Sequence, residues 1–154
     1  MSWSGGCQCG AVRYRVEGEL GRPSICHCRM CQKAMGGPFG PFVSVKIDQI
    51  TWTRGERRRF ASSNKVHRGF CGDCGTPLTF EWSAEVIDFA IYTFDRASEI
   101  VPVVQLEAAA AAPWVGHIAD LPVRDPRTEP HLAGYYASVV SNQHPDHDTD
   151  DWKA

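Results

Sequence analysis

The sequence has no long apolar run and no strong excess of charge of either sign. Of its 154 residues, 43% are hydrophobic and 22% are charged, and the formal net charge is −2. No stretch approaches the roughly 18 apolar residues that a membrane-spanning helix needs. A nearly balanced charge also provides no basic field that would attract nucleic acid. We therefore expect no membrane and no nucleic-acid partner.

The N-terminus, MSWSGGCQCG, lacks the charged stretch and apolar run that mark a signal peptide. The cytoplasm is therefore the simplest expected location. A length of 154 residues fits one domain with a substantial core and is short for two.

Helical patterns are also scarce, whereas β-type patterns recur along the chain. Alternating polarity or a high content of β-branched and aromatic residues predicts strands at 12–17, 42–47, 50–54, 76–82 and 86–94. Short helices are predicted near 29–37 and 130–140, and Pro113 cuts short a run of five alanines. The fold class is therefore mostly β, in a single domain with few short helices. The polar, acidic stretch from 142 onward predicts a loose tail.

The cysteines number seven, so they cannot all pair as disulfides. They are Cys7, Cys9, Cys26, Cys28, Cys31, Cys71 and Cys74. Every one lies within three positions of another, and a disulfide framework is unusual in a reducing compartment. The clustering therefore favours metal binding.

Two of the clusters are cysteine pairs followed directly by glycine, CQCG at 7–10 and CGDCG at 71–75. Glycine permits a positive φ, which turns backbone N–H groups toward the sulfur atoms. Such turns usually meet in pairs, so we predict that Cys7, Cys9, Cys71 and Cys74 form a closed, structural four-thiolate zinc site. The alternative is that they are reduced, buried cysteines without a metal.

The third cluster, Cys26, Cys28 and Cys31, has no fourth cysteine beside it. Zinc sites with three protein ligands and one open position are typically catalytic. Water or a substrate thiol would take the open position. The alternatives are a site completed by a histidine and a site that holds no metal.

The order and spacing of four motifs resemble the glutathione-dependent formaldehyde-activating enzyme family. The motifs are GGCQCGAVRY, CHCRMCQKAMG, RGFCGDCGTPLTF and APWVGHIADLP, and the resemblance covers about residues 3–123. It implies a zinc-bound domain at 1–125, built from twisted antiparallel sheets packed face to face and similar in shape to a Rab exchange factor. Residues 126–154 would form a C-terminal extension that ends in a partly disordered acidic tail.

The resemblance also implies a function and assigns the ligands. Two zinc ions per chain would bind, a structural one at Cys7, Cys9, Cys71 and Cys74 and a catalytic one at Cys26, Cys28 and Cys31. The chain would be a carbon-sulfur lyase resembling S-(hydroxymethyl)glutathione synthase, with glutathione as co-substrate and formaldehyde or a related aldehyde as its partner. The alternative is a non-catalytic, zinc-stabilised protein-binding module.

Two further features bear on this function. Members of the family often have a histidine at the position that is Gln105 here, so any role of that histidine is in doubt in this chain. The arginines of TRGERRRF (53–60) could bind the carboxylates of glutathione, although charges that guard a strand edge explain them as well.

Overall fold

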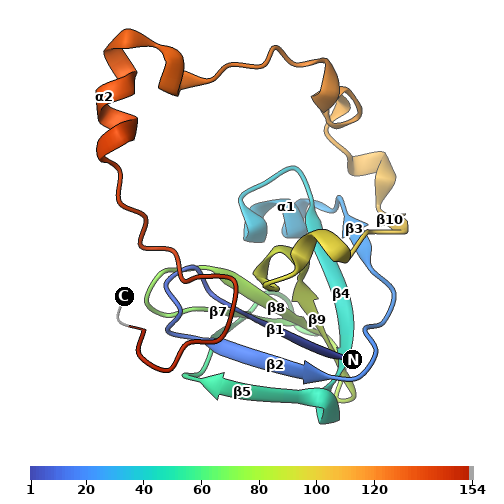
Figure 1. The fold of residues 1–154 in the computed structure, drawn as a ribbon. Helices are drawn as coiled ribbons and strands as arrows, with labels where there is room; N and C mark the ends of the chain where they lie inside the picture. The colour runs from blue at the N-terminus through green and yellow to red at the C-terminus, as the bar shows by residue number, and fades with distance from the viewer. Residues whose placement is uncertain (153–154) are drawn as a thin grey trace.

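The computed structural model describes residues 1–152, which form two β-sheets and a few short helices (Figure 1). The small sheet is antiparallel and contains, in spatial order, β1 (Ser2–Gly6), β2 (Arg13–Glu17) and β5 (Ile50–Arg54). The large sheet contains, in spatial order, β10 (Val104–Leu106), β3 (Ser24–Cys26), β4 (Gly40–Lys46), β9 (Val86–Ala90), β8 (Pro77–Glu81), β7 (His67–Phe70) and β6 (Arg58–Ala61). Only the pairing of β10 with β3 is parallel among these strands. The predicted mostly β fold class is confirmed.

The helices are short, as predicted. The α-helices are α1 (Arg29–Met35) and α2 (Pro130–Ser138). The 3-10 turns are η1 (Ile47–Gln49), η2 (Ile91–Thr93), η3 (Ala97–Glu99), η4 (Ala108–Ala110), η5 (Pro113–Asp120) and η6 (Pro126–Thr128). Helix α1 stops at Gly36, whose φ of 64° is the left-handed conformation that commonly ends a helix. The alanine run forms only the single turn η4, because Pro113 prevents its continuation. No helix among the described residues is long and apolar enough to cross a membrane.

The core lies between the two sheets. The ring of Tyr14 from the small sheet is fully buried, with its centroid 4.3 Å from that of Phe89 in the large sheet. Val43 and Val45 are buried beside Phe89 in the same core cluster. The inner face of the large sheet is therefore the face that carries Val43, Val45 and Phe89.

The register of the large sheet defines its outer face. Residues that pair across neighbouring strands project to the same side, and residues two apart along one strand do so as well. Arg68 pairs with Phe80, Phe80 with Asp88, and Asp88 with Ser44. The alternation then continues through Phe42 and its partner in β3 to Cys26. Cys26 and Arg68 thus share the outer face, away from the core.

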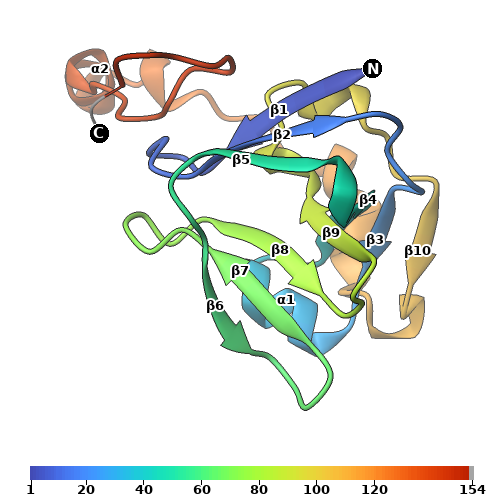
Figure 2. The same ribbon diagram turned by 90° about the horizontal axis from the view of Figure 1, so that it is seen from below.

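Beyond β10 the chain leaves the body as an extended arm and then returns (Figures 1 and 2). None of residues 107–143, which include η5 and α2, is buried. The segment 144–152 packs on the body again, whereas the sequence predicts a loose tail. Its contacts explain the difference. Asp148 pairs with Arg13, and the indole N–H of Trp152 donates to the carbonyl of Cys9 at 2.6 Å. The boundary between a domain and an extension near 125 stays a prediction.

Candidate metal centres

The first cysteine group joins the two sheets. Cys7 and Cys9 lie in the turn between β1 and β2, and Cys71 and Cys74 lie in the turn between β7 and β8. Their four sulfur atoms lie within 4.8 Å of one another. The structure therefore brings together the four residues that the sequence groups, from hairpins of different sheets.

The spacing of these sulfur atoms fits a metal rather than disulfides. The Sγ atoms of Cys7 and Cys9 are 3.6 Å apart, and those of Cys9 and Cys71 are 3.9 Å apart. A disulfide would need about 2.05 Å, whereas a tetrahedron with Zn–S distances of about 2.3 Å has edges of about 3.8 Å. The residues present thus fit a zinc ion.

The two turns are built alike. Gly10 and Gly75 follow the second cysteine of each pair with φ of 74° and 78°, as the sequence predicts. Each donates its N–H to the carbonyl of the first cysteine at 3.0 Å. Backbone N–H groups also point at the sulfurs, since the N–H of Val12 donates to Cys7 Sγ at 3.2 Å. Such donors stabilise thiolates.

Ionisation of the four thiols calls for a cation. Burial and, to a smaller extent, the neighbouring thiols Cys71 and Cys9 raise the pKa of Cys7 to about 12. At Cys74, burial opposes ionisation, but hydrogen bonds from Thr76 outweigh it and lower the pKa to about 6. Four thiolates this close would repel one another, so full ionisation requires a divalent ion between them.

The C-terminal segment covers the first of these turns. His144 is buried and donates its backbone N–H to the carbonyl of Gln8 at 2.7 Å. The ring of Trp152 lies at 5.0 Å from the ring of His144, centroid to centroid. A β-carbon on Gly10 would lie 2.2 Å from the His144 ring, so only glycine fits beneath this segment. The aromatic pair therefore shields the turn from solvent.

The second group lies at the end of β3 and the start of α1. The sulfur atoms of Cys26, Cys28 and Cys31 lie within 4.8 Å of one another, and no other Cys, His, Asp or Glu among residues 1–152 joins this group. Cys28 is the residue before α1, and its sulfur accepts the N–H of Cys31 at 3.4 Å. Three ligands and an open side are what the sequence predicts here.

The three thiols differ in their environment. Burial and, to a smaller extent, the adjacent thiols Cys31 and Cys28 raise the pKa of Cys26 to about 12. At Cys28, burial opposes ionisation, but hydrogen bonds from the N–H groups of Cys31 and Met30 and from the thiols of Cys31 and Cys26 outweigh it and lower the pKa. Burial raises the pKa of Cys31, and Arg68 opposes that effect. A cation that binds here would ionise all three.

Arg68 lies beside the three-cysteine group, and the sequence analysis did not identify it. Its Nη2 donates to Cys31 Sγ at 3.3 Å, and its side chain is almost completely buried on the outer face of the large sheet. Its Nε donates to Ser62 Oγ at 3.0 Å, and its guanidinium lies 4.8 Å from the centre of the Phe80 ring. The hydroxyl and the ring fix the direction in which this cation points.

An apolar cavity of about 190 Å³ adjoins Arg68. Its walls come from α1 and from the outer face of the sheet, and they include Ala34, Met35, Phe42, Phe60, Phe70 and Leu78. Since Arg68 both lines this cavity and contacts Cys31, the cavity lies beside the three-cysteine group. A molecule that reaches the group from this side meets an apolar wall with one cation.

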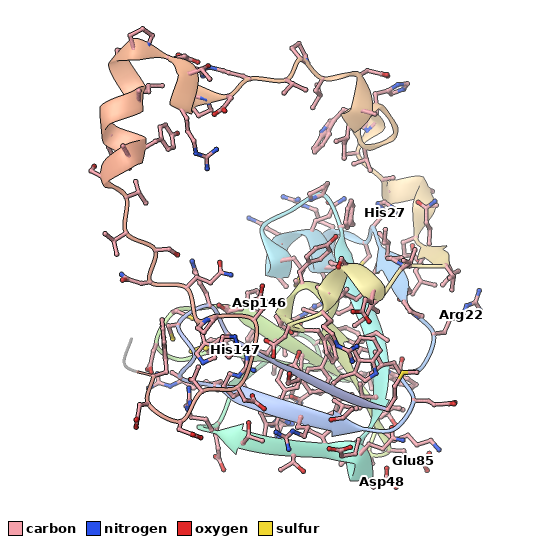
Figure 3. The ribbon with its side chains drawn as sticks, in the orientation of Figure 1. Arg22, His27, Asp48, Glu85, Asp146 and His147 are labelled. Atoms are coloured by element: carbon pink, nitrogen blue, oxygen red, sulfur yellow. The ribbon has the colours of Figure 1, made fainter. Side chains whose placement is uncertain are left out.

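Gln105 lies on the other side of β3. The Nε2–H of His27 donates to Gln105 Oε1 at 2.8 Å, and both residues line a groove together with Ile25. Gln105 pairs with Ile25 in the parallel register, whereas Leu106 pairs with Cys26. A side chain at position 105 therefore faces His27 and the groove, away from the side on which Cys26 lies. Figure 3 shows His27 between β3 and β10.

The predicted basic wall is divided among three places. Arg54 bonds to Gly10 and to the C-terminal segment. Arg57 and Arg59 pair with Glu81 on the inner side of the sheet, and Arg58 points to the outer side, next to Gly72. None of these four arginines contacts the three-cysteine group within the described chain.

Three comparisons relate this chain to known proteins. Residues 2–108 match the sequence model of a family described as glutathione-dependent formaldehyde-activating enzyme. An uncharacterized lyase of Schizosaccharomyces pombe is 30% identical over 81 residues, which make up 53% of this chain and 58% of that protein. The chain thus spans less than two thirds of the length of this curated relative. A crystal structure of a Rhodobacter sphaeroides protein matches with a TM-score of 0.55 at 19% identity, over 66% of this chain and 98% of that one. That likeness concerns the fold alone.

Proposed function

This chain belongs to the glutathione-dependent formaldehyde-activating enzyme family, and we propose that it is a zinc-dependent carbon-sulfur lyase. In the reaction, the sulfur of a glutathione-type thiol bonds to the carbonyl carbon of an aldehyde, and the thiol proton ends on the carbonyl oxygen. Elimination is the reverse. The observation that carries the proposal is the group of three cysteines without a fourth protein ligand among residues 1–152.

The cysteines of this group would hold the metal and would not themselves attack the substrate. When bound there, zinc would supply a Lewis acid that lowers the pKa of a coordinated substrate thiol and makes it a thiolate at neutral pH. Cys7, Cys9, Cys71 and Cys74 would hold a second, structural zinc with no position left for substrate.

Arg68 would act as a positioning residue for Cys31. Three thiolates around a divalent ion leave a net negative charge, which a nearby guanidinium offsets inside a poorly solvated site. The hydrogen bond to Cys31 Sγ at 3.3 Å also fixes the direction of one ligand. The reacting thiol would therefore bind to an almost neutral centre.

The apolar cavity indicates where the carbon part of the adduct would lie. Its volume of about 190 Å³ exceeds the roughly 150 Å³ of an apolar cavity that accepts benzene. Formaldehyde has a single carbon and would leave most of this space unfilled. We therefore expect aldehydes that carry an aliphatic or aromatic group to be better substrates than formaldehyde, by about tenfold for a buried phenyl group.

The test begins with the zinc content of the purified full chain, measured by native mass spectrometry. Two ions per chain are expected. The exchange between free aldehyde and its glutathione adduct is then followed by NMR exchange spectroscopy, because the reaction also proceeds without an enzyme. Formaldehyde and phenylacetaldehyde are compared, each relative to its uncatalysed exchange.

The matched variants are Cys28→Ser and Cys71→Ser. Serine is a good residue before a helix, so Cys28→Ser should keep the fold and the thermal midpoint while the exchange falls to the uncatalysed rate. Exchange at the uncatalysed rate for a chain with two bound zinc ions would refute the lyase. Equal acceleration of both aldehydes would refute the role of the cavity in substrate preference, but it would not refute the lyase reaction.

A further inference from the structure

We propose that the basic cleft at the open margin between the two sheets is a second ligand site, for a small organic anion that carries a flat apolar group. The basic cleft is lined by Trp52, Arg57, Arg59, Lys65, Glu81 and Trp82, among others, and has a volume of about 600 Å³. This site lies outside the three-cysteine group and is independent of the proposed lyase function.

Glu81 organises the charges of the cleft. It is 9% exposed, and its Oε1 accepts from Arg57 Nε at 2.6 Å and from Thr79 Oγ1 at 2.7 Å. Arg59 Nε lies 2.9 Å from the second oxygen, Oε2. Both guanidinium groups are thus held through Nε. Their terminal NH₂ groups, which are the pair that binds phosphate and carboxylate side by side, have no hydrogen bond to the described chain.

The cleft carries an excess of positive charge. Three permanent cations line it, Arg57, Arg59 and Lys65, and Glu81 is the only acidic residue among its lining residues. One carboxylate does not neutralise three cations, so the charged lining residues leave a net charge of +2 (three cations and one carboxylate). An anion of one or two charges would complete the balance.

The aromatic residues explain why the ligand would also have an apolar part. The guanidinium of Arg57 lies 4.5 Å from the centre of the Trp52 ring, so the cation and the ring form one surface. Trp82 also lines the cleft and is 54% exposed, and its indole N–H donates to Asp88 Oδ2 at 3.0 Å, on the outer side of the sheet. A flat group bound against the surface of Trp52 and Arg57 would bury apolar area there.

Protection of an edge strand does not account for this arrangement. Strand β6 is the last strand of the large sheet, and charged side chains that project into solvent would suffice to guard it. Arg58 has that arrangement, on the outer side. Arg57 and Arg59 instead turn inward onto a nearly buried carboxylate. The three consecutive arginines, of which Arg58 and Arg59 belong to β6, therefore divide into one on the outer side and two that form a site.

The basic cleft and the three-cysteine group lie on opposite faces of the large sheet, since Arg59 points to the inner side and Arg68 to the outer side. Two lining residues of the cleft, Ile47 and Ala84, adjoin Asp48 and Glu85, which Figure 3 shows at the end of the body opposite to His27. Glu81 also lies on the inner side of the sheet, opposite to Arg68. A ligand in the cleft would leave the lyase site free.

The test uses the zinc-loaded full chain and phenyl phosphate as the probe, with binding measured by calorimetry and by tryptophan fluorescence. Inorganic phosphate and benzyl alcohol are the comparison ligands, since each carries only half of the recognised chemistry. One molecule of phenyl phosphate per chain is expected, bound more tightly than either comparison ligand. No binding of phenyl phosphate would overturn the site, and equal binding of inorganic phosphate would overturn the apolar requirement.

Arg59→Gln is the decisive variant and Arg58→Gln is its matched control, since the two arginines are adjacent, exposed and on opposite sides of β6. Arg59→Gln should weaken phenyl phosphate binding by about tenfold or more, because it removes a charged hydrogen-bond donor. Arg58→Gln should leave the affinity unchanged, and neither variant should alter aldehyde exchange. If both variants weakened binding equally, the probe would respond to the net positive charge of the surface and not to a specific contact with Arg59, which would overturn the site.

Discussion

Replacement of Arg68 by methionine should weaken zinc binding at the three-cysteine group and leave the four-cysteine group unchanged. Methionine keeps an unbranched chain that can pack on Phe80, but it removes the donor that lies 3.3 Å from Cys31 Sγ. Loss of an outer hydrogen-bond partner of a metal ligand typically costs 10- to 100-fold in affinity. That range is about 1.4 to 2.8 kcal/mol, in agreement with a charged hydrogen bond of about 1.5 to 3 kcal/mol.

The assay is a competition for zinc with a chromogenic chelator at fixed pH. Zinc should leave the wild-type chain in two steps, the first from the three-cysteine group and the second from the four-cysteine group. In Arg68→Met the first step should move to a chelator concentration lower by 10- to 100-fold, with the second step in place. Arg58→Met is the control for the first step, since it removes an exposed arginine from the same outer face that lies next to Gly72, in the turn of the four-cysteine group, and not at Cys31.

An unchanged first step in Arg68→Met would refute the role of this arginine in holding Cys31. An equal shift of both steps would refute it as well, because that result would indicate a general loss of stability. A thermal midpoint measured without chelator separates these outcomes. The cation–π contact with Phe80 contributes about 0.5 to 2 kcal/mol to the fold and not to zinc affinity.

Three further predictions concern the four-cysteine group and the segment that covers it. Cys71→Ser should release one zinc per chain and lower the free energy of unfolding by more than about 4 kcal/mol, measured by denaturant titration with a zinc count. Trp152→Ala should cost about 1 to 2 kcal/mol, seen as a fall of about 2 to 8 °C in the thermal midpoint, since it removes a hydrogen bond and an aromatic contact. Gly10→Ala should destabilise more than Gly36→Ala in the same assay. Both positions have positive φ, but only the first β-carbon would collide with a neighbour; equal losses would contradict this reasoning.

The partition of the cysteines could be predicted from the sequence because it depends on local spacing. Each cluster forms a single turn, and glycine after Cys9 and Cys74 adopts the positive φ that the motif requires. The same holds for strands with clear alternation. In β9 and the turn that follows it, Ile87, Phe89 and Ile91 are all buried in the core.

Other elements could not be predicted because distant residues determine them. Strands β3 and β10 have only three residues each, too few for an alternating pattern. Strand β3 forms because β4 offers an edge to pair with, and β10 forms because β3 then offers the next edge. Strand β1 ends in Gly5 and Gly6, which usually indicate a turn. A β-carbon at Gly5 would lie 2.5 Å from the Tyr14 hydroxyl, so the glycine allows the close approach of that ring.

Arg68 and the C-terminal segment were missed for the same reason. The role of Arg68 depends on the register that aligns it with Phe80 and, across three further strands, with Cys26. No pattern near residue 68 reveals this. Likewise, the acidic composition of the tail indicates disorder when it is considered by itself. In the structure, Asp148 accepts a hydrogen bond from Arg13, which lies 135 positions away in the sequence.

The two faces of the large sheet impose a constraint on any thiol substrate. A tripeptide thiol such as glutathione has two carboxylates, and its sulfur must reach the outer face, where Cys26 and Arg68 lie. Arg57 and Arg59 point inward and bind Glu81, so they cannot reach the same molecule through the sheet. Among the exposed cations on the cysteine side, Arg29 and Lys33 belong to α1, the helix that contains Cys31. Recognition of a thiol by its carboxylates would therefore depend first on the helix that follows Cys28, and an anion in the basic cleft would be a different molecule.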